Sequence, residues 1–250
     1  MTALAQGTIL RLASLLGFVA LWQLSATLLN NPLAPGPAVV LARLWQETAA
    51  GELLYHLGVT LARVTVSFFL ALLLGTAIGI LMGRYRRLDA GLDGVLVLAL
   101  NIPALVAIIL CYIWFGLTEA AAVTAVALNK IPTVVVTVRE GARAVDTRLL
   151  QVGEAFRVPR MRAFTRIYLP QLYPYVMAAA RSGLALIWKI VLVVELLGRS
   201  NGVGFQLGTY FQFFDITSIL AYTLAFAAVV LLVESVVMRP LERRLTRWRP

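Results

Sequence analysis

Six long apolar segments constrain this chain more than any other feature. They cover residues 9–29, 58–82, 94–115, 120–138, 173–197 and 218–238. As a helix rising about 1.5 Å per residue, each segment can cross a hydrocarbon core of about 30 Å. Apolar residues make up 60% of the chain and charged residues 14%, against about 45–50% and 25% in soluble domains. We therefore expect an all-α integral membrane protein, with six transmembrane helices in a single domain over residues 1–250.

The first and third segments leave alternatives open. The first segment has Arg11 before its long apolar stretch and could be a signal peptide. Its apolar stretch exceeds the usual h-region of about 7–15 residues, and Asn30-Asn31-Pro32 is a poor cleavage site, which favours a first span. Asn101 and Pro103 interrupt the third segment. Such a break is tolerated where the backbone is buried in protein or lines a wet cavity.

The basic residues predict the orientation. Of 22 Lys and Arg, 15 lie in the segments 83–93, 139–170 and 239–250. The alternate segments between the spans hold only Arg43 and Arg199. By the positive-inside rule, both termini are expected in the cytoplasm. Because topology accounts for most of the net charge of +10, the excess does not require a nucleic acid partner.

The second segment carries Gly75, Gly79 and Gly83 at intervals of four residues. Small residues at this spacing let two helices approach closely in lipid. The pattern predicts a tight helix contact, either within one subunit or between two.

Residues 37–51 precede this segment and have Val40, Leu41 and Leu44 at helical spacing. This pattern predicts a short helix. The helix could lie in the outer membrane interface or pack as part of a loop.

The residue inventory disfavours an enzyme. With a single His, His56, and a single Cys, Cys111, the chain lacks an intrachain disulfide and most histidine-based catalytic or metal sites. It contains no G-x-x-x-x-G-K-[ST] sequence with which to bind nucleotide phosphates. We therefore expect no catalytic residue, metal or bound cofactor.

The basic segment 139–170 carries the clearest functional signal. Pro159 biases Val158 away from helix, so the segment should divide into two short helices there. Beyond the break, Met161, Phe164 and Tyr168 recur at helical spacing, with arginines on the other faces. A short basic helix with aromatic anchors is suited to docking into a groove on a partner.

This segment resembles the coupling loop of ABC-type importer permeases, in which an EAA triplet, three residues, a Gly and nine residues precede I-x-L-P. Ile167, Leu169 and Pro170 match its end. Counting back puts the pattern's Gly at Arg157 and its EAA at residues 151–153, so the first half is degenerate.

Further pieces over residues 30–250 resemble the nitrate/sulfonate/taurine branch of these permeases. They are Leu33-Ala-Pro-Gly-Pro37, Gly51-Glu-Leu53, His56, Arg63, Gly79-Ile-Leu-Met-Gly83, Ile102-Pro103, Trp114-Phe-Gly116, Pro132, Gly141, Glu195-Leu-Leu-Gly198 and Gly202-Val-Gly-Phe205.

The resemblance implies a type I ABC importer permease in the cell inner membrane, passing a small anionic solute. Its implied partners are a second permease copy, two ATPase subunits that bind ATP and Mg, and an external or periplasmic binding protein. The implied coupling residues are Gln151, Gly153, Glu154, Arg157, Pro159, Arg160, Phe164, Ile167, Leu169 and Pro170. Gly198, Gly202, Gly204 and Phe205 would form an external gate or contact the binding protein.

Charges within the spans have two readings. Lys130, Arg181, Lys189 and Glu195 could line a pathway for an anion, or they could form structural salt bridges and snorkel. Lys189 and Glu195 are six positions apart and should not pair within one helix.

A stand-alone secondary transporter or channel is the alternative function. That class predicts internal repeats, of which the two halves of this chain give no convincing sign, and it leaves the basic docking segment without a purpose.

Overall fold

The computed structural model describes residues 3–31 and 33–246, and the regular elements among them are all helices. The first half contains α1 (Ala3–Leu29), α2 (Pro37–Ala50), α3 (Glu52–Arg84), α4 (Arg86–Asn101), α5 (Ala104–Phe115) and α6 (Glu119–Arg143). The second half contains α7 (Thr147–Ala155), α8 (Arg160–Ala163), the π-helical turn η1 (Phe164–Tyr168), α9 (Leu169–Gly198), α10 (Val203–Gln212), α11 (Ile216–Val233), the π-helical turn η2 (Glu234–Met238) and α12 (Arg239–Thr246).

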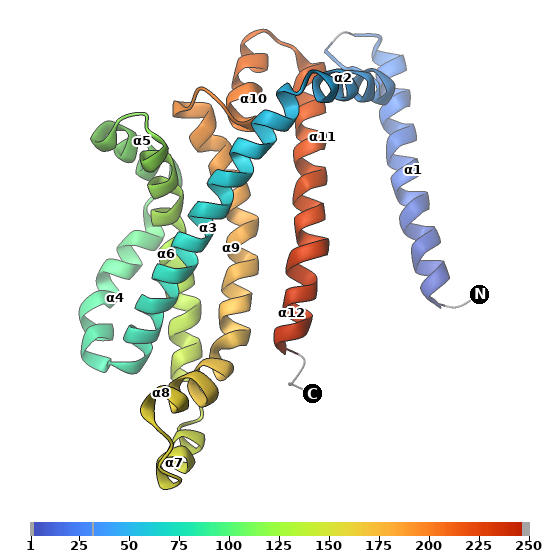
Figure 1. The fold of residues 1–250 in the computed structure, drawn as a ribbon. Helices are drawn as coiled ribbons and strands as arrows, with labels where there is room; N and C mark the ends of the chain where they lie inside the picture. The colour runs from blue at the N-terminus through green and yellow to red at the C-terminus, as the bar shows by residue number, and fades with distance from the viewer. Residues whose placement is uncertain (1–2, 32, 247–250) are drawn as a thin grey trace.

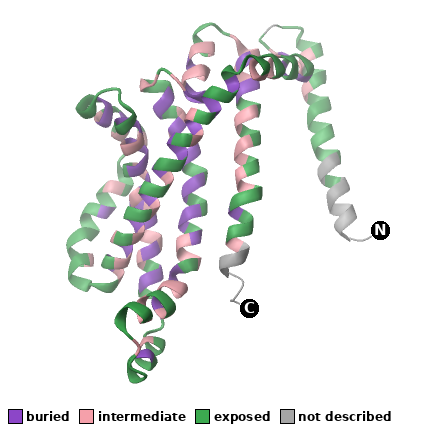
Figure 2. Ribbon diagram, in the orientation of Figure 1, coloured by how far each residue is buried: buried purple, intermediate pink, exposed green. Residues whose placement is uncertain are grey.

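The core is a bundle of α3, α6 and α9 (Figure 1). One end of the bundle carries α2 and α10 and is called here the α10 end. The opposite end carries α7 and α8 and is called the α7 end. The start of α1 and the whole of α12 lie toward the α7 end. Buried residues concentrate on the three central helices, whereas α1 and α4 are largely exposed (Figure 2).

Four continuous helices in the described residues are long and apolar enough to cross a membrane, namely 52–84, 119–143, 160–198 and 216–242. The described apolar part of α1, Ala13–Leu29, is shorter. The interruption expected within 94–115 is present, because α4 and α5 meet there at an angle of 97°, so the six expected spans appear in the described part of the chain as four continuous helices and, at most, this bent pair as a fifth. Pro103 supplies no backbone N–H and holds Ile102 in an extended conformation, so the break falls where Asn101 and Pro103 interrupt the pattern.

The glycines of α3 form a tight contact with α6 inside one subunit, which answers the question left open by their spacing. A Cβ added at Gly79 would lie 2.9 Å from both the Val135 carbonyl oxygen and the Val138 Cβ. Gly75 faces Val134, and Gly83 faces Ala142. The two backbones are therefore packed too closely for any side chain at these positions.

Helix α2 packs one face on the bundle and exposes the other. Val40 is buried, Trp45 is exposed, and the Arg43 Nε donates to the Ser218 Oγ at 2.8 Å. Asp215 caps α11 by accepting from the Ser218 backbone N–H. Burial alone would raise the pKa of Asp215, but the Ser218 hydrogen bonds and the Arg43 charge outweigh it and lower that pKa.

The segment between α6 and α9 divides into two short helices around Pro159, as predicted. Arg157, where the family pattern has Gly, adopts a left-handed conformation with φ of 53°. The turn closes through the Val158 N–H, which donates to the Gly153 carbonyl at 2.9 Å. The turn expected of a glycine thus forms with an arginine, at the steric cost that a Cβ brings to this conformation.

Met161, Phe164 and Tyr168, predicted to recur on one helical face as anchors for a partner, are not all accessible to one. Tyr168 is buried, and Phe164 stacks on it with ring centroids 5.6 Å apart. Only Met161 stays fully exposed, because the π-helical turn of residues 164–168 rotates the later side chains inward.

The glycine contact predicts a selective loss of stability. Gly79→Ala should lower the free energy of unfolding in detergent by about 1–3 kcal/mol, because the added methyl group overpacks the α3–α6 contact. SDS titration followed by circular dichroism measures this change.

Gly91→Ala in α4 is the matched control, because a Cβ there meets nothing within 4 Å. Equal effects of the two substitutions would contradict the close contact.

Candidate functional site

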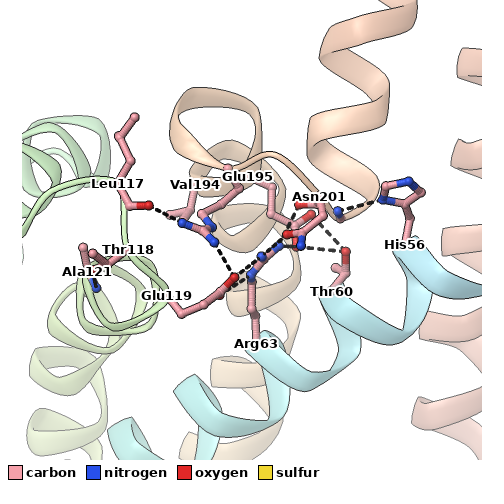
Figure 3. Close-up of polar contacts among 12 residues, drawn as sticks. His56, Thr60, Arg63, Leu117, Thr118, Glu119, Ala121, Val194, Glu195 and Asn201 are labelled. Atoms are coloured by element: carbon pink, nitrogen blue, oxygen red, sulfur yellow. Dashed lines mark hydrogen bonds and ion pairs between the residues drawn. The ribbon is translucent and has the colours of Figure 1, made fainter.

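A buried arginine organises the α10 end. The Arg63 side chain, on α3, is 4% exposed. Its Nε and Nη2 donate to the two carboxylate oxygens of Glu119 at 2.8 and 2.6 Å. Its Nη1 donates to Glu195 at 2.7 Å and to the Asn201 backbone carbonyl at 2.8 Å, and Nη2 also donates to the Asn201 side chain. All five guanidinium donors are therefore engaged, as Figure 3 shows.

Glu195, near the end of α9, is the carboxylate buried deepest in this group, with a side chain 0% exposed. Besides Arg63, it accepts from the Thr60 hydroxyl at 2.9 Å and from the Gly204 backbone N–H at 2.8 Å. A buried carboxylate costs several kcal/mol unless it is paired and hydrogen-bonded. Two donors from α3, Arg63 and Thr60, and one from α10, Gly204, meet that requirement here.

The loop between α9 and α10 is held by its backbone. The Gly202 N–H donates to His56 Nδ1 at 2.9 Å, and the Val203 N–H donates to the Thr60 Oγ1 at 2.8 Å. Gly202 has φ of 106°, and a Cβ there would overlap the Glu195 carboxylate. The glycine is needed both for this backbone conformation and for the close approach of the loop to the carboxylate. We call residues 198–205, with their anchors His56, Thr60, Arg63 and Glu195, the clasp.

Glu119 connects the clasp to α6. It lies in the first turn of that helix, directly after the N-cap Thr118, where a helix dipole favours a negative charge. Besides Arg63, it accepts from Arg199, which also donates to the Leu117 carbonyl. One carboxylate therefore bridges two arginines and joins α3, α6 and the loop after α9.

Three of the four predicted pathway residues lie away from this cluster, and the four do not share a surface. Glu195 belongs to the clasp. Lys130 is 1% exposed in the middle of α6, where its side chain passes Gly183, and its Nζ has no partner among the described residues. Arg181 pairs with Glu234 and Glu242. Lys189 is exposed and, as predicted, does not pair with Glu195.

The predicted gate residues do come together. Gly202 and Gly204 lie against Glu195, and Gly198 lies against Tyr112. Phe205 is half-buried, with its ring centroid 6.3 Å from that of His56.

The predicted coupling residues gather at the α7 end. The 30 residues of α9, about 45 Å of helix, separate them from the clasp. Gly153 is buried against Ile167, and Gln151, Glu154, Arg157, Pro159 and Arg160 are exposed. Phe164, Ile167, Leu169 and Pro170 are half-buried. Neighbouring apolar side chains outside the predicted set, Phe156 and Met161, are 80% and 74% exposed.

The sequence reasoning missed Thr60, Glu119 and Asn201. Thr118-Glu119 carries a usable local signal, an N-cap followed by an acid in the first helical turn. Nothing local marks Thr60 or Asn201, because their partners lie 135 and 138 positions away along the chain.

A bundle of apolar helices with buried ion pairs at one end and short amphipathic helices beyond the other defines a membrane transport subunit. Comparison with known proteins gives the family. Residues 72–247 match the binding-protein-dependent transport system inner membrane components, and the chain belongs to this family. It is thus the permease subunit of an ABC importer, a multi-pass inner-membrane protein whose ATPase is a separate subunit.

The similarity to relatives extends along nearly the whole chain. The aliphatic sulfonates transport permease protein SsuC of Bacillus subtilis is 30% identical, with 92% of this chain and 84% of that protein covered. The taurine transport system permease protein TauC of Escherichia coli is 28% identical over 98% and 91%. The bicarbonate transport system permease protein CmpB of Synechococcus elongatus is 25% identical over 91% and 86%.

A solved structure confirms the fold. An inward-facing conformation of the MetNI methionine ABC transporter superposes with a TM-score of 0.69 at 18% identity, covering 80% of this chain and 99% of that chain.

The arginine cluster predicts strong energetic coupling. Arg63→Gln should destabilise the protein by about 3–5 kcal/mol, because it leaves Glu195 and Glu119 without their main partner. Combining it with Glu195→Gln should cost less than the sum of the single changes, by about 1–3 kcal/mol. SDS unfolding of the four proteins in the cycle measures this coupling.

Arg143→Gln, which removes the pairs of a largely exposed arginine with Glu140 and Asp89, should cost about 1 kcal/mol or less. Strict additivity of Arg63→Gln and Glu195→Gln would mean that the buried pair contributes nothing.

Proposed function

We propose that this permease passes a small anionic solute of the nitrate, sulfonate, taurine or bicarbonate kind, delivered by an external binding protein. The names of relatives over nearly the full chain support this solute class. Two copies of the chain would form the pathway, with two ATPase subunits that hold ATP and Mg on the cytoplasmic side.

The charge distribution supports an orientation with the α7 end in the cytoplasm. The segments rich in arginine lie at the α7 end, whereas Arg43 and Arg199 lie at the α10 end. In this orientation the clasp faces the binding protein, and α7 and α8 face the motor.

The observation that carries the coupling proposal is the exposure of Phe156 and Met161 at the α7 end. They flank the left-handed turn at Arg157 and lie among exposed arginines, with Met161 in the first turn of the continuous helix 160–198. Large apolar side chains held outside the bilayer on short, ordered helices indicate a partner surface. The ATPase subunit is the partner that the family supplies.

Transport then follows from two packings of one helix bundle. Closure of the ATPase dimer would move α7 and α8, and α9 continues from them to the clasp. A binding protein can drive this switch only by contacting one packing better than the other.

The solute class predicts selective uptake. Proteoliposomes with the permease, its ATPase and its binding protein should import ethanesulfonate, taurine, nitrate or bicarbonate only with ATP, and should import no neutral analogue such as dimethyl sulfone. Radiolabelled uptake measures this selectivity. ATP-independent uptake would support a stand-alone transporter, and import of neutral solutes alone would refute the anion assignment.

The coupling surface predicts loss of motor docking. Phe156→Ala combined with Met161→Ala should reduce both ATPase co-purification and ATP-driven uptake at least about tenfold, because both exposed anchors are removed. Pull-down and hydrolysis assays measure the two effects.

Leu88→Ala is the control, since Leu88 is an exposed apolar residue on α4. Unchanged stimulation of hydrolysis by loaded binding protein in the Phe156/Met161 variant would locate the motor contact elsewhere.

A further inference from the structure

A hollow of about 620 Å³ opens at the α10 end, between the α5–α6 connection, the end of α9 and α10. Its volume lies in the range of small-molecule sites, which is about 300–1,000 Å³. The polar side chains that line it are Arg199, Ser200, Thr209 and Gln212. Leu117, Leu196 and Phe211 contribute apolar wall. One cation, two hydroxyls and an amide thus face a partly apolar space.

Arg199 differs from Arg63 in how its donors are used. Arg63 engages all five of its N–H groups. Arg199 donates to the Leu117 carbonyl and to Glu119, and its Nε is buried without a partner among the described residues. The Arg199 side chain is 12% exposed. That Nε is enclosed by protein, so a ligand in the hollow would meet the guanidinium at Nη1 and Nη2, each of which has a second N–H besides the one already bonded.

The charges around the hollow are arranged with the positive end toward it. Arg63 and Arg199 balance Glu119 and Glu195 in sum. Arg199 lines the hollow, however, and neither carboxylate does. Arg199 therefore lines the hollow as one member of an ion-pair network, in which it shares Glu119 with Arg63.

We propose that this hollow binds a small anion with a short apolar group, of the alkyl sulfonate type, with Arg199 as its charge partner. The proposal rests on the proposed function and gives the anionic solute a first contact beside the clasp. A sulfonate has three acceptor oxygens, and two of them can accept hydrogen bonds from neighbouring N–H groups of the planar guanidinium. Ser200 and the Gln212 amide can donate to the remaining oxygen, and the alkyl group lies against Leu117 and Phe211.

Thiol labelling tests the proposal directly. A cysteine is placed on the wall by Ser200→Cys, with Cys111→Ala removing the native thiol. The permease in nanodiscs is treated with sulfonatoethyl methanethiosulfonate, which itself carries an ethanesulfonate group, or with its cationic trimethylammonioethyl counterpart. Ala50→Cys, an exposed position on α2, is the matched control.

The anionic reagent should be favoured over the cationic one at Ser200→Cys by about tenfold or more relative to Ala50→Cys, because a cationic cleft concentrates anions. Ethanesulfonate should slow labelling at Ser200→Cys but not at Ala50→Cys, and dimethyl sulfone should slow neither. Arg199→Gln should abolish both the preference and the protection. Arg199→Lys should keep the preference and weaken the protection, because it retains the charge and loses the fork.

To check folding, the Arg199 variants are also made with Cys111 retained and without Ser200→Cys. Cys111 is a buried thiol, so it should stay unreactive toward both reagents in each folded variant. An unchanged reagent preference in a folded Arg199→Gln variant, or the absence of protection by ethanesulfonate, would overturn the proposal. If the wild-type complex imports ethanesulfonate without such protection, the hollow is refuted and the proposed function stands. If protection is present and no anion is imported, the hollow is supported and the proposed function fails.

Discussion

The structure depends on one guanidinium held out of water. Arg63 carries a full charge inside a bundle of apolar helices, where an unpaired ion costs several kcal/mol. It is tolerated because Glu119, Glu195 and Asn201 together accept all five of its N–H bonds. Those acceptors lie on α6, on α9 and in the loop after α9, so satisfying one charge fixes the relative positions of three segments.

The remaining features of the α10 end follow from this constraint. Glu195 can stay charged only with its other oxygen satisfied, and the Gly204 backbone N–H approaches it because residues 202 and 204 lack side chains. Thr60 donates to Glu195 and accepts from Val203, so one hydroxyl fastens the loop to the carboxylate. At the other end of the bundle the same helix, α9, continues into the turn beside α8. The bundle is thus tied at one end by charges and packed closely between α3 and α6 at Gly75, Gly79 and Gly83.

The sequence predicts the parts of this structure that depend on local pattern. Hydropathy predicts the long apolar helices. The glycines at intervals of four residues on α3 predict a tight helix contact, and the structure shows that its partner is α6. Pro159 predicts the division of the coupling segment. Counting back from Ile167 aligns the family's Gly with Arg157, a mismatch that argues against the family's turn, yet the left-handed backbone forms there. Local pattern fails where a side chain's surroundings are set by distant partners. Phe164 and Tyr168 turn inward because a π-helical turn changes the helical phase. The sequence gives no local sign that distinguishes the four charges within the predicted spans, Lys130, Arg181, Lys189 and Glu195. Only Glu195 joins the clasp, and its partner Arg63 lies 132 positions earlier in the chain.

Backbone hydrogen exchange in residues 202–204 tests the central claim, that the Arg63 cluster holds the loop, most directly. The N–H groups of Gly202, Val203 and Gly204 are bonded to His56, Thr60 and Glu195. Mass spectrometry of the permease in nanodiscs should find these amides slow to exchange in the wild type. In Arg63→Gln they should exchange at least about tenfold faster, while the centre of α6 stays protected. Fast exchange in the wild type, or the same slow exchange in both proteins, would contradict the account.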